Sequence, residues 1–336
     1  MQDIRDVSLE ELKTLLTDWG IPGYRAGQIF TWLYQKGVED FDRMTNLPPD
    51  LRQRIRRHFS LSVLRSIKES RSIDGTRKFL IGLTDQDLVE SVLIPAKDRM
   101  TGCISAQVGC RYGCRFCASG LLGFKRHLSP GEIINQVLFL KQSESLSNLV
   151  VMGVGEPMDN YDNVLKALRI INSPRGLGVG ARKITISTCG IIPGIKRLAG
   201  EGLQIRLSVS LHSADDKIRT RLMPINKRYP LGELINACQY YIHETNRLVT
   251  FEYLLIKDVN SGVNDARQMA RLLTGLNCKV NLIPYNPVAE FEFNAPGRRQ
   301  VSSFCNTLVE SGIKATIRVP RGQDVRAACG QLRIKR

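Results

Sequence analysis

The spacing of apolar residues divides the chain into a short helical part and a longer part in which strands and helices alternate. Near the N-terminus, an apolar stripe at helical spacing runs from Leu9 to Trp19. Ser8 and Glu11 form a capping box at the start of this stripe, which is a common signal for the beginning of a helix. Two further stripes follow, and together they predict a helical accessory domain over residues 1–70.

The third of these expected helices begins near Pro49 and has a strongly basic outer face. Leu51 and Ile55 mark its apolar side. The rest of the helix is crowded with arginine: Arg52, Arg54, Arg56 and Arg57. Such a face is either an ordinary solvated helix surface or a place of RNA contact.

Between residues 71 and 97 the apolar positions change to strict alternation. Phe79, Ile81 and Leu83 follow this pattern, and so do Val89 and Leu93. Alternation is the period of half-buried strands. This segment is therefore predicted to be a strand-rich connector.

From residue 98 to residue 336, short β-branched runs alternate with helical patterns. The runs lie near residues 149, 183, 205, 249, 279 and 314, and the helical patterns cover residues 129–142, 159–172, 231–246, 262–275 and 298–312. This alternation is typical of a parallel sheet with crossover helices. The predicted fold is α/β, a partial (β/α)6 barrel with a small helical N-terminal domain, and a doubly wound sheet is the alternative.

Several of these strands end in polar groups that an apolar core would not accommodate. They are Gly155 and Glu156 after LVVM, Ser187 in KITIST, Ser210 and His212 in LSVSLH, and Asn286 in LIPYNP. In parallel α/β folds the active site lies at the carboxyl ends of the strands, so these residues are expected to converge on one pocket.

Composition adds a class of partner to this picture. The 336 residues carry 48 Lys and Arg against 32 Asp and Glu, a formal net charge of +16, which points to a nucleic-acid binder. The chain begins with an acidic amphipathic segment, and nowhere do eighteen apolar residues follow one another. We therefore expect a soluble, cytoplasmic protein without membrane contact, and in the absence of a hydrophobic repeat we expect a monomer.

Nine cysteines, an odd and scattered number, argue against a secreted disulfide framework. Three of them, Cys110, Cys114 and Cys117, lie together in CRYGCRFCASG after a predicted strand. Three thiolates on one loop suit a [4Fe-4S] cluster with one iron open to a small chelating molecule. A structural zinc site is the competing interpretation, but zinc usually takes four ligands and the chain has no second CxxC.

The wider sequence resembles the radical S-adenosylmethionine (SAM) RNA adenine methyltransferases of the RlmN/Cfr family. The resemblance rests on VGCRYGCRFCASG, MGVGEPMDN, ISTCGIIPGIKRL, SVSLHSADDKIRTRLMPINKRYP, NLIPYNP and RGQDVRAACGQL. Pro157 after Gly155-Glu156 favours the branch that acts at adenine C2 over the branch that acts at C8. Asp159 departs from the residue types common at that position in the family.

The resemblance implies an enzyme that uses a [4Fe-4S] cluster and two SAM molecules per turnover to methylate C2 of adenosine in 23S rRNA and tRNA. It also implies a supply of electrons from a reductase system such as flavodoxin. The nearest alternative is the C8-methylating relative. An alternative of another class is a non-catalytic RNA-binding protein with a zinc-stabilised loop.

The resemblance also assigns roles to individual residues. Cys329 corresponds to the cysteine that carries the methyl group as S-methylcysteine, and Cys103 to the resolving cysteine that closes a transient disulfide with it. Glu90 corresponds to a proton acceptor, with a plain salt bridge as its alternative role. The expected SAM contacts are Gly155, Glu156, Ser187, Ser210, Leu211, His212 and Asn286. The cysteines outside these roles, Cys189, Cys238, Cys278 and Cys305, are expected to be small buried residues.

Overall fold

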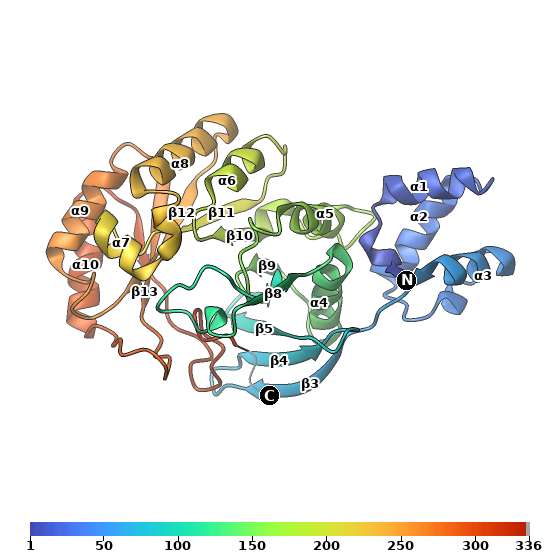
Figure 1. The fold of residues 1–336 in the computed structure, drawn as a ribbon, viewed down its shortest axis with the longest axis horizontal. Coiled ribbons are helices and arrows are strands. Elements are labelled where there is room, and N and C mark those ends of the chain that lie inside the picture. The colour runs from blue at the N-terminus through green and yellow to red at the C-terminus, as the bar shows by residue number, and fades with distance from the viewer. Residues whose placement is uncertain (334–336) are drawn as a thin grey trace.

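The computed structural model describes residues 1–333 and begins with a compact set of helices (Figure 1). These are α1 (Leu9–Asp18), α2 (Tyr24–Phe30), which continues into a π-helical turn (Thr31–Gln35), and α3 (Pro49–His58). The capping box of α1 is confirmed, because Ser8 Oγ accepts from the Glu11 amide and Glu11 Oε2 accepts from the Ser8 amide. Two short parallel strands, β1 (Gln2–Asp3) and β2 (Phe59–Ser60), join the two ends of this helical part.

A ten-stranded sheet forms the rest of the molecule, and its antiparallel edge contains the segment expected to be a connector. This edge consists of β3 (Arg65–Arg71), β4 (Arg77–Gly82) and β5 (Leu88–Ala96), and β5 pairs with β6 (Arg99–Ile104). The first strand therefore starts inside the range expected to be helical. These strands belong to the same sheet as the parallel strands and do not form a separate link.

Seven parallel strands continue the sheet from β6. In spatial order they are β6, β9 (Asn148–Val151), β10 (Ile184–Thr188), β11 (Arg206–Ser210), β12 (Val249–Leu255), β13 (Cys278–Pro284) and β14 (Ala315–Ile317). Spatial order equals chain order throughout. A doubly wound sheet reverses its strand order at a switch point, so the predicted partial barrel is confirmed and the doubly wound alternative is wrong.

Helices connect the successive parallel strands and lie along the outside of the curved sheet (Figure 1). The crossover helices are α4 (Pro130–Ser143), α5 (Tyr161–Asn172), α6 (Ile192–Ala199), α8 (Leu231–Thr245), α9 (Val263–Leu273) and α10 (Arg298–Glu310), with a short α7 (Asp216–Leu222) before α8. No helix in residues 1–333 is both long enough and apolar enough to cross a membrane.

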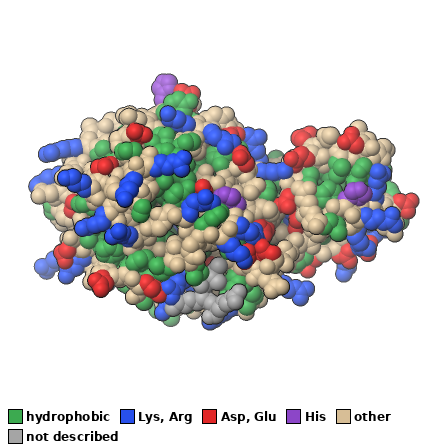
Figure 2. Space-filling model, in the orientation of Figure 1, with side chains coloured by type: hydrophobic (Ala, Val, Ile, Leu, Met, Phe, Trp, Pro, Cys, Tyr) green, Lys and Arg blue, Asp and Glu red, His purple; other side chains and the backbone are tan. Residues whose placement is uncertain are grey.

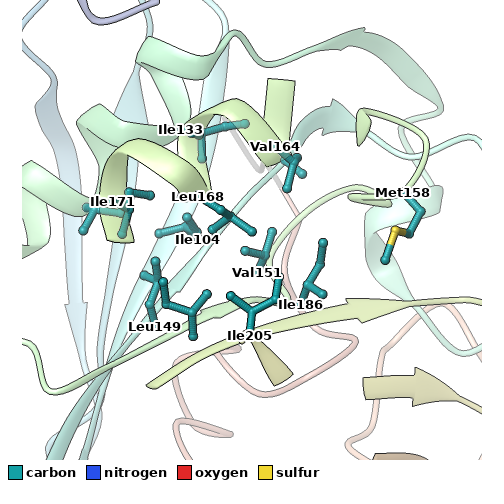
Figure 3. Close-up of a cluster of buried hydrophobic side chains, with 14 of the residues drawn as sticks. Ile104, Ile133, Leu149, Val151, Met158, Val164, Leu168, Ile171, Ile186 and Ile205 are labelled. Carbon is teal, nitrogen blue, oxygen red and sulfur yellow. The ribbon is translucent and has the colours of Figure 1, made fainter. Parts of the chain in front are cut away.

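The main core fills the space between these helices and the outer face of the sheet (Figure 3). Ile104 and Val151 pair across β6 and β9, and both are buried against Leu168 of α5. Successive side chains of a strand point to opposite faces, so their chain neighbours face the inside of the barrel. Among these neighbours, Cys103 and Val150 pair with each other, and this pair borders the site described next.

Candidate active site

A cavity of about 930 Å³, including its open mouth, lies at the carboxyl ends of the parallel strands. The sequence-predicted residues that line it are Cys110, Cys114, Cys117, Gly155, Glu156, Ser187, Ser210, His212 and Cys329. Leu211 and Asn286 are absent from its walls. The expected convergence of strand-end residues is therefore found for most of the set.

The three clustered cysteines lie on a loop between the short strands β7 (Gln107–Gly109) and β8 (Phe124–His127). Gly109 begins the loop with a φ of +75°, and a Cβ atom there would stand 1.9 Å from the Gly123 carbonyl oxygen. Only glycine permits this close approach. The loop therefore has the tight turn needed to bring its three thiols to one cavity.

The surroundings of these thiols fit a metal cluster. Burial and the neighbouring thiol of Cys117 raise the pKa of Cys110 to about 12, and burial also raises the pKa values of Cys114 and Cys117. Buried thiolates therefore need a nearby positive charge, which bound iron supplies. Within residues 1–333, no three such side chains are close enough to share one metal ion. The cavity between them has room for a larger group.

Gly153, Gly155 and Glu156 line the same cavity as the cysteine loop. A Cβ atom on Gly153 would stand 2.7 Å from the Ile104 backbone, and one on Gly155 would stand 2.5 Å from Gln107 Cβ. The two glycines therefore let the chain pass close to β6 and β7. Glu156 Oε1 accepts from the Met158 amide at 2.9 Å, and Oε2 accepts from the Cys189 amide at 2.7 Å.

The Glu156 carboxylate is a suitable partner for a cationic amino group. It is buried, and burial raises its pKa above the ordinary value although backbone donors oppose this shift. Burial without a cationic neighbour disfavours the negative charge of this carboxylate. An ammonium group bound beside it would balance that charge.

His212 has a structural role in the wall of the cavity. Its φ is +56°, its Nδ1 accepts from the Leu254 amide at 3.0 Å, and its ring meets Phe116 edge to face. Burial lowers the pKa of His212 to about 3, so the ring stays neutral. Leu211 is fully buried in the main core, and its amide donates to the Glu252 carbonyl.

A second cavity of about 490 Å³, including its open mouth, adjoins the first, and Cys329 lines both. Cys103 lines only the second cavity, where burial raises its pKa to about 12. Asn286 also lines this second cavity, and its Nδ2 donates to the Cys329 carbonyl at 3.1 Å. The structure thus brings Cys103, Asn286 and Cys329 together, and it assigns Asn286 to the segment that carries Cys329.

All nine cysteines, including Cys103 and Cys329, are free thiols. The structure therefore does not support the transient disulfide bond expected between these two residues.

Comparisons with known proteins decide the family. A family model described as the radical SAM superfamily matches residues 104–273, and one described as the ribosomal RNA large subunit methyltransferase N-terminal domain matches residues 2–61. Proteins named probable dual-specificity RNA methyltransferase RlmN from Geobacillus kaustophilus (strain HTA426) and Staphylococcus aureus (strain JH9) are 48% and 47% identical to the chain. These alignments cover 100% and 99% of the chain and 93% of each relative.

The chain belongs to the RlmN family of radical SAM RNA methyltransferases. A solved structure agrees: a radical SAM methyltransferase from Sphaerobacter thermophilus superposes with a TM-score of 0.93 at 44% identity, over 99% of each chain. The family and the class of enzyme expected from the sequence are thereby confirmed.

Membership in the RlmN family implies a [4Fe-4S] cluster and SAM, and the described residues fit both. Cys110, Cys114 and Cys117 would hold three of the irons, and Glu156 would bind the SAM amino group. When bound, the cluster and SAM supply the radical chemistry of the family. Asp159, the departure from the family pattern, accepts from Gln107 at 2.7 Å and from Tyr112 at 3.0 Å, so it braces the cysteine loop.

Glu90 lies outside both cavities. It is buried on β5, and its Oε1 pairs with Lys78 Nζ at 3.0 Å. Burial still raises its pKa, and its Oε2 has no hydrogen-bond partner among the described residues. Glu90 lines a third cavity, together with Arg326 and Arg333. The contacts of Glu90 therefore support its alternative role, a plain salt bridge.

Three further residues of the first cavity were not identified from the sequence. Cys189, expected to be a small buried residue, is half-buried in the cavity wall and hydrogen-bonds Glu156. Glu252 and Arg318 also line this cavity, and Arg318 hydrogen-bonds the Cys329 side chain. Cys189 and Arg318 each follow a strand directly, so the strand-end signal that selected Ser187 could have found them.

Proposed function

We propose that this enzyme methylates C2 of adenosine in 23S rRNA and tRNA through an S-methylcysteine formed on Cys329. The observation that carries the proposal is the position of Cys329, which borders both the cysteine-loop cavity and the cavity that contains Cys103. A thiol placed there can be loaded with a methyl group from one side and present it on the other. The names of the relatives, dual-specificity RNA methyltransferases, support two classes of RNA substrate.

The chemistry of adenine C2 explains why a cysteine carrier is needed. C2 lies between two ring nitrogens and is electron-poor, so it does not act as a nucleophile toward the methyl group of SAM. A carbon radical can add to such a ring, and this requires a methyl group already attached to the enzyme. A cysteine sulfur can accept the methyl group and hold it during radical formation. The cycle then uses two SAM molecules, one as methyl donor and one as radical source.

The residues around Cys329 have complementary roles in this proposal. The Arg318 guanidinium hydrogen-bonds the Cys329 side chain, so a cation lies beside the sulfur that accepts the methyl group. Cys103 lines the second cavity with Cys329, and we assign it a part in releasing the methylated adenine from Cys329. Glu90 lines neither of these two cavities and pairs with Lys78, so we assign it an indirect effect on proton transfer. Electrons come from a reductase of the flavodoxin type, and the enzyme acts as a monomer.

The decisive experiment identifies the modified nucleoside. Anaerobically reconstituted enzyme is mixed with SAM, a reductant and either 23S rRNA fragments or tRNA, and the RNA is digested to nucleosides. The expected product is 2-methyladenosine by mass and retention time. Recovery of 8-methyladenosine would favour the C8-methylating alternative. Protein that binds zinc but no iron or sulfide would favour the non-catalytic RNA-binding protein.

Replacing the carrier cysteine tests the role of Cys329 directly. Cys329→Ala should reduce RNA methylation below detection, because no sulfur remains to hold the methyl group. The matched control is Cys305→Ala, which removes another half-buried thiol on α10 outside both cavities. Product formed by Cys329→Ala at the wild-type rate would show that the methyl group does not pass through this residue.

A further inference from the structure

We propose that Arg219, a buried residue of α7, supplies a positive charge beside the iron-sulfur cluster and favours its reduced form. The proposal concerns the cluster alone, so it does not depend on which adenine carbon is methylated. Arg219 lines neither cavity. It lies behind the part of the first cavity's wall that contains Cys189 and Ser210, because it donates to the carbonyls of both residues.

The Arg219 guanidinium is almost completely buried, with an exposed fraction of 1%. Its Nη2 donates to the Cys189 carbonyl at 2.9 Å and to the Ser210 carbonyl at 3.2 Å. Its Nε donates to the Leu211 carbonyl at 3.2 Å, and its Nη1 donates to the side-chain oxygen of Asn226. In the described part of the chain, these hydrogen bonds therefore all go to neutral acceptors.

This arrangement leaves the charge of Arg219 incompletely balanced. A guanidinium stays charged in a protein, and a buried charge without a partner of opposite sign costs free energy. Asp216, on the same helix, is connected to Arg219 through Asn226, whose Nδ2 donates to Asp216 Oδ1 at 2.9 Å. A negative group bound in the first cavity would balance the guanidinium from the other side.

The thiols of the first cavity are close enough for the charge of Arg219 to act on them. Burial lowers the pKa of Arg219, and Cys189 and Cys114 are the groups that oppose this shift most. Conversely, burial raises the pKa of Cys114, and the charge of Arg219 acts in the opposite direction. Helix α7 also touches the cysteine loop, because the Arg115 amide donates to the Leu222 carbonyl at 2.9 Å. The guanidinium therefore lies near the place where Cys114 would hold an iron.

A cation in this position affects how readily the cluster accepts an electron. Three cysteine thiolates outweigh the positive charge of an oxidised [4Fe-4S] core, and the electron taken up on reduction adds a further negative charge. A fixed cation nearby stabilises the more negative state, and a surrounding that is poor in water strengthens this effect. Arg219 therefore raises the reduction potential of the cluster.

A redox titration tests this role without any methyl transfer. Arg219→Gln removes the charge and keeps an amide that can donate to a strand-end carbonyl. In anaerobically reconstituted protein without SAM, dithionite and mediator dyes set the solution potential, and electron paramagnetic resonance measures the reduced cluster. At the wild-type midpoint, we expect the ratio of reduced to oxidised cluster to fall roughly tenfold in Arg219→Gln, which is about 59 mV for a one-electron couple.

Two control variants separate this effect from general consequences of losing an arginine. Arg5→Gln removes a similarly buried guanidinium in the N-terminal part, which also donates to neutral acceptors. We expect it to lower the melting temperature and to leave the ratio unchanged. Arg221→Gln removes an exposed cation of α7 and should change the ratio by less than about twofold, because solvent and salt screen its charge.

Asp216→Asn tests the same charge from the other direction. Asparagine keeps an oxygen for the Leu231 amide and for Asn226, but it no longer offsets the charge of Arg219. We therefore expect the ratio to rise, by roughly twofold because solvent weakens this interaction. This variant decides the question if Arg219→Gln fails to hold a cluster.

A wild-type ratio in Arg219→Gln would overturn the role of Arg219, and so would an equal decrease in Arg5→Gln. An unchanged ratio in Asp216→Asn would overturn it where Arg219→Gln holds no cluster. Wild-type protein that assembles no cluster would overturn the assignment of the cysteine loop as well. Normal RNA methylation by a wild-type enzyme whose potential none of these variants changes would leave the proposed function intact and reject only the role of Arg219.

Discussion

Cys238 and Cys329 are both free cysteines, but different groups surround their side chains. Cys238 is fully buried in the main core, and burial raises the pKa of its thiol to about 12. Cys329 instead contacts the Arg318 guanidinium, whose own pKa is raised mainly by this thiol. The two thiols therefore differ in the groups that surround them: Cys238 has apolar neighbours, and Cys329 has a cation beside it.

The buried His212 predicts a measurable dependence of stability on pH. Its pKa is lowered to about 3 by burial, so between pH 6.5 and 3 the unfolded chain binds a proton there that the folded chain does not. Stability therefore falls as pH decreases through this window. From pH 7 to pH 5 the loss from this group amounts to about 2 kcal/mol. Denaturant titrations at both pH values measure it.

In His212→Asn, the loss of stability between pH 7 and pH 5 should be smaller than in the wild type by most of the stated value, about 2 kcal/mol. Asparagine tolerates the positive φ and can accept from the Leu254 amide, but it does not titrate. His243→Asn is the control, because the His243 side chain is 86% exposed. An equal decrease in stability for wild type and His212→Asn would show that this ring does not carry the effect.

At the scale of elements, the turn between β3 and β4 holds the segment that carries Cys329. Ser72 Oγ donates to Asp324 Oδ1 at 2.6 Å, and the Ile73 amide donates to Oδ2 at 3.2 Å. In return, the Gly322 amide donates to Asp74 Oδ2 at 2.9 Å. Hydrogen-bond donors around Asp74 lower its pKa to about 2, although burial opposes this shift. The antiparallel edge of the sheet thus positions the C-terminal segment that carries Cys329.

Removing this attachment should loosen the C-terminal segment without unfolding the barrel. In Asp324→Ala, we expect native-state trypsin cleavage after Arg321 or Arg326 to be roughly tenfold faster, because local opening costs less free energy. RNA methylation should fall with it. The matched control is Asp98→Ala, at the turn between β5 and β6. Unchanged cleavage in Asp324→Ala would mean that other contacts fix the segment.

At the scale of the whole molecule, hydrogen bonds of two neighbouring side chains connect the N-terminal part to helix α4 of the barrel. Arg5 is 3% exposed and donates to Asn135 Oδ1 on α4 at 2.8 Å. Asp6 Oδ1 accepts from the Gly131 amide at 2.7 Å, at the N-terminus of the same helix, where a negative charge is favoured. These contacts set where the basic face of α3 stands relative to the active site. Figure 2 shows Lys and Arg side chains on both parts of the molecule.

The arginines of α3 are not equivalent, which refines the expectation of RNA contact. Arg56 pairs with Asp40 at 2.9 Å and with Asp42 at 2.6 Å, so its charge is largely balanced. Arg54 lies over the Trp19 ring, and both Arg54 and Arg57 are exposed. We expect Arg54→Glu combined with Arg57→Glu to weaken RNA binding roughly tenfold at low salt. The salt slope should decrease by about 1 for each RNA phosphate that is no longer neutralised by an arginine.

Arg56→Ala is the matched control on the same helix and should have a smaller effect. Filter binding over a range of salt concentrations measures both quantities. An unchanged salt slope in the double variant would remove α3 from the RNA interface.

The sequence by itself determined the features that depend on near neighbours in the chain. Ser8 and Glu11 predicted the start of α1, and the alternation of strand and helix predicted the partial barrel, because consecutive βα units pack side by side in chain order. The same regularity explains why strand-end residues such as Glu156 and Ser187 met in one cavity. The spacing of Cys110, Cys114 and Cys117 needed no tertiary information, because one loop carries all three.

Tertiary structure decided the contacts between segments that are distant in the chain. The family resemblance selected Glu90, but only the pairing of β4 with β5 brought Lys78 to it. The strand-end rule selected Asn286, but the fold of the C-terminal segment turned its amide toward Cys329. A periodic pattern predicts which way a side chain faces. The burial of that side chain and the charges beside it depend on which residues the fold brings next to it. For this reason, the location of Cys329 between two cavities could be seen only in the folded molecule.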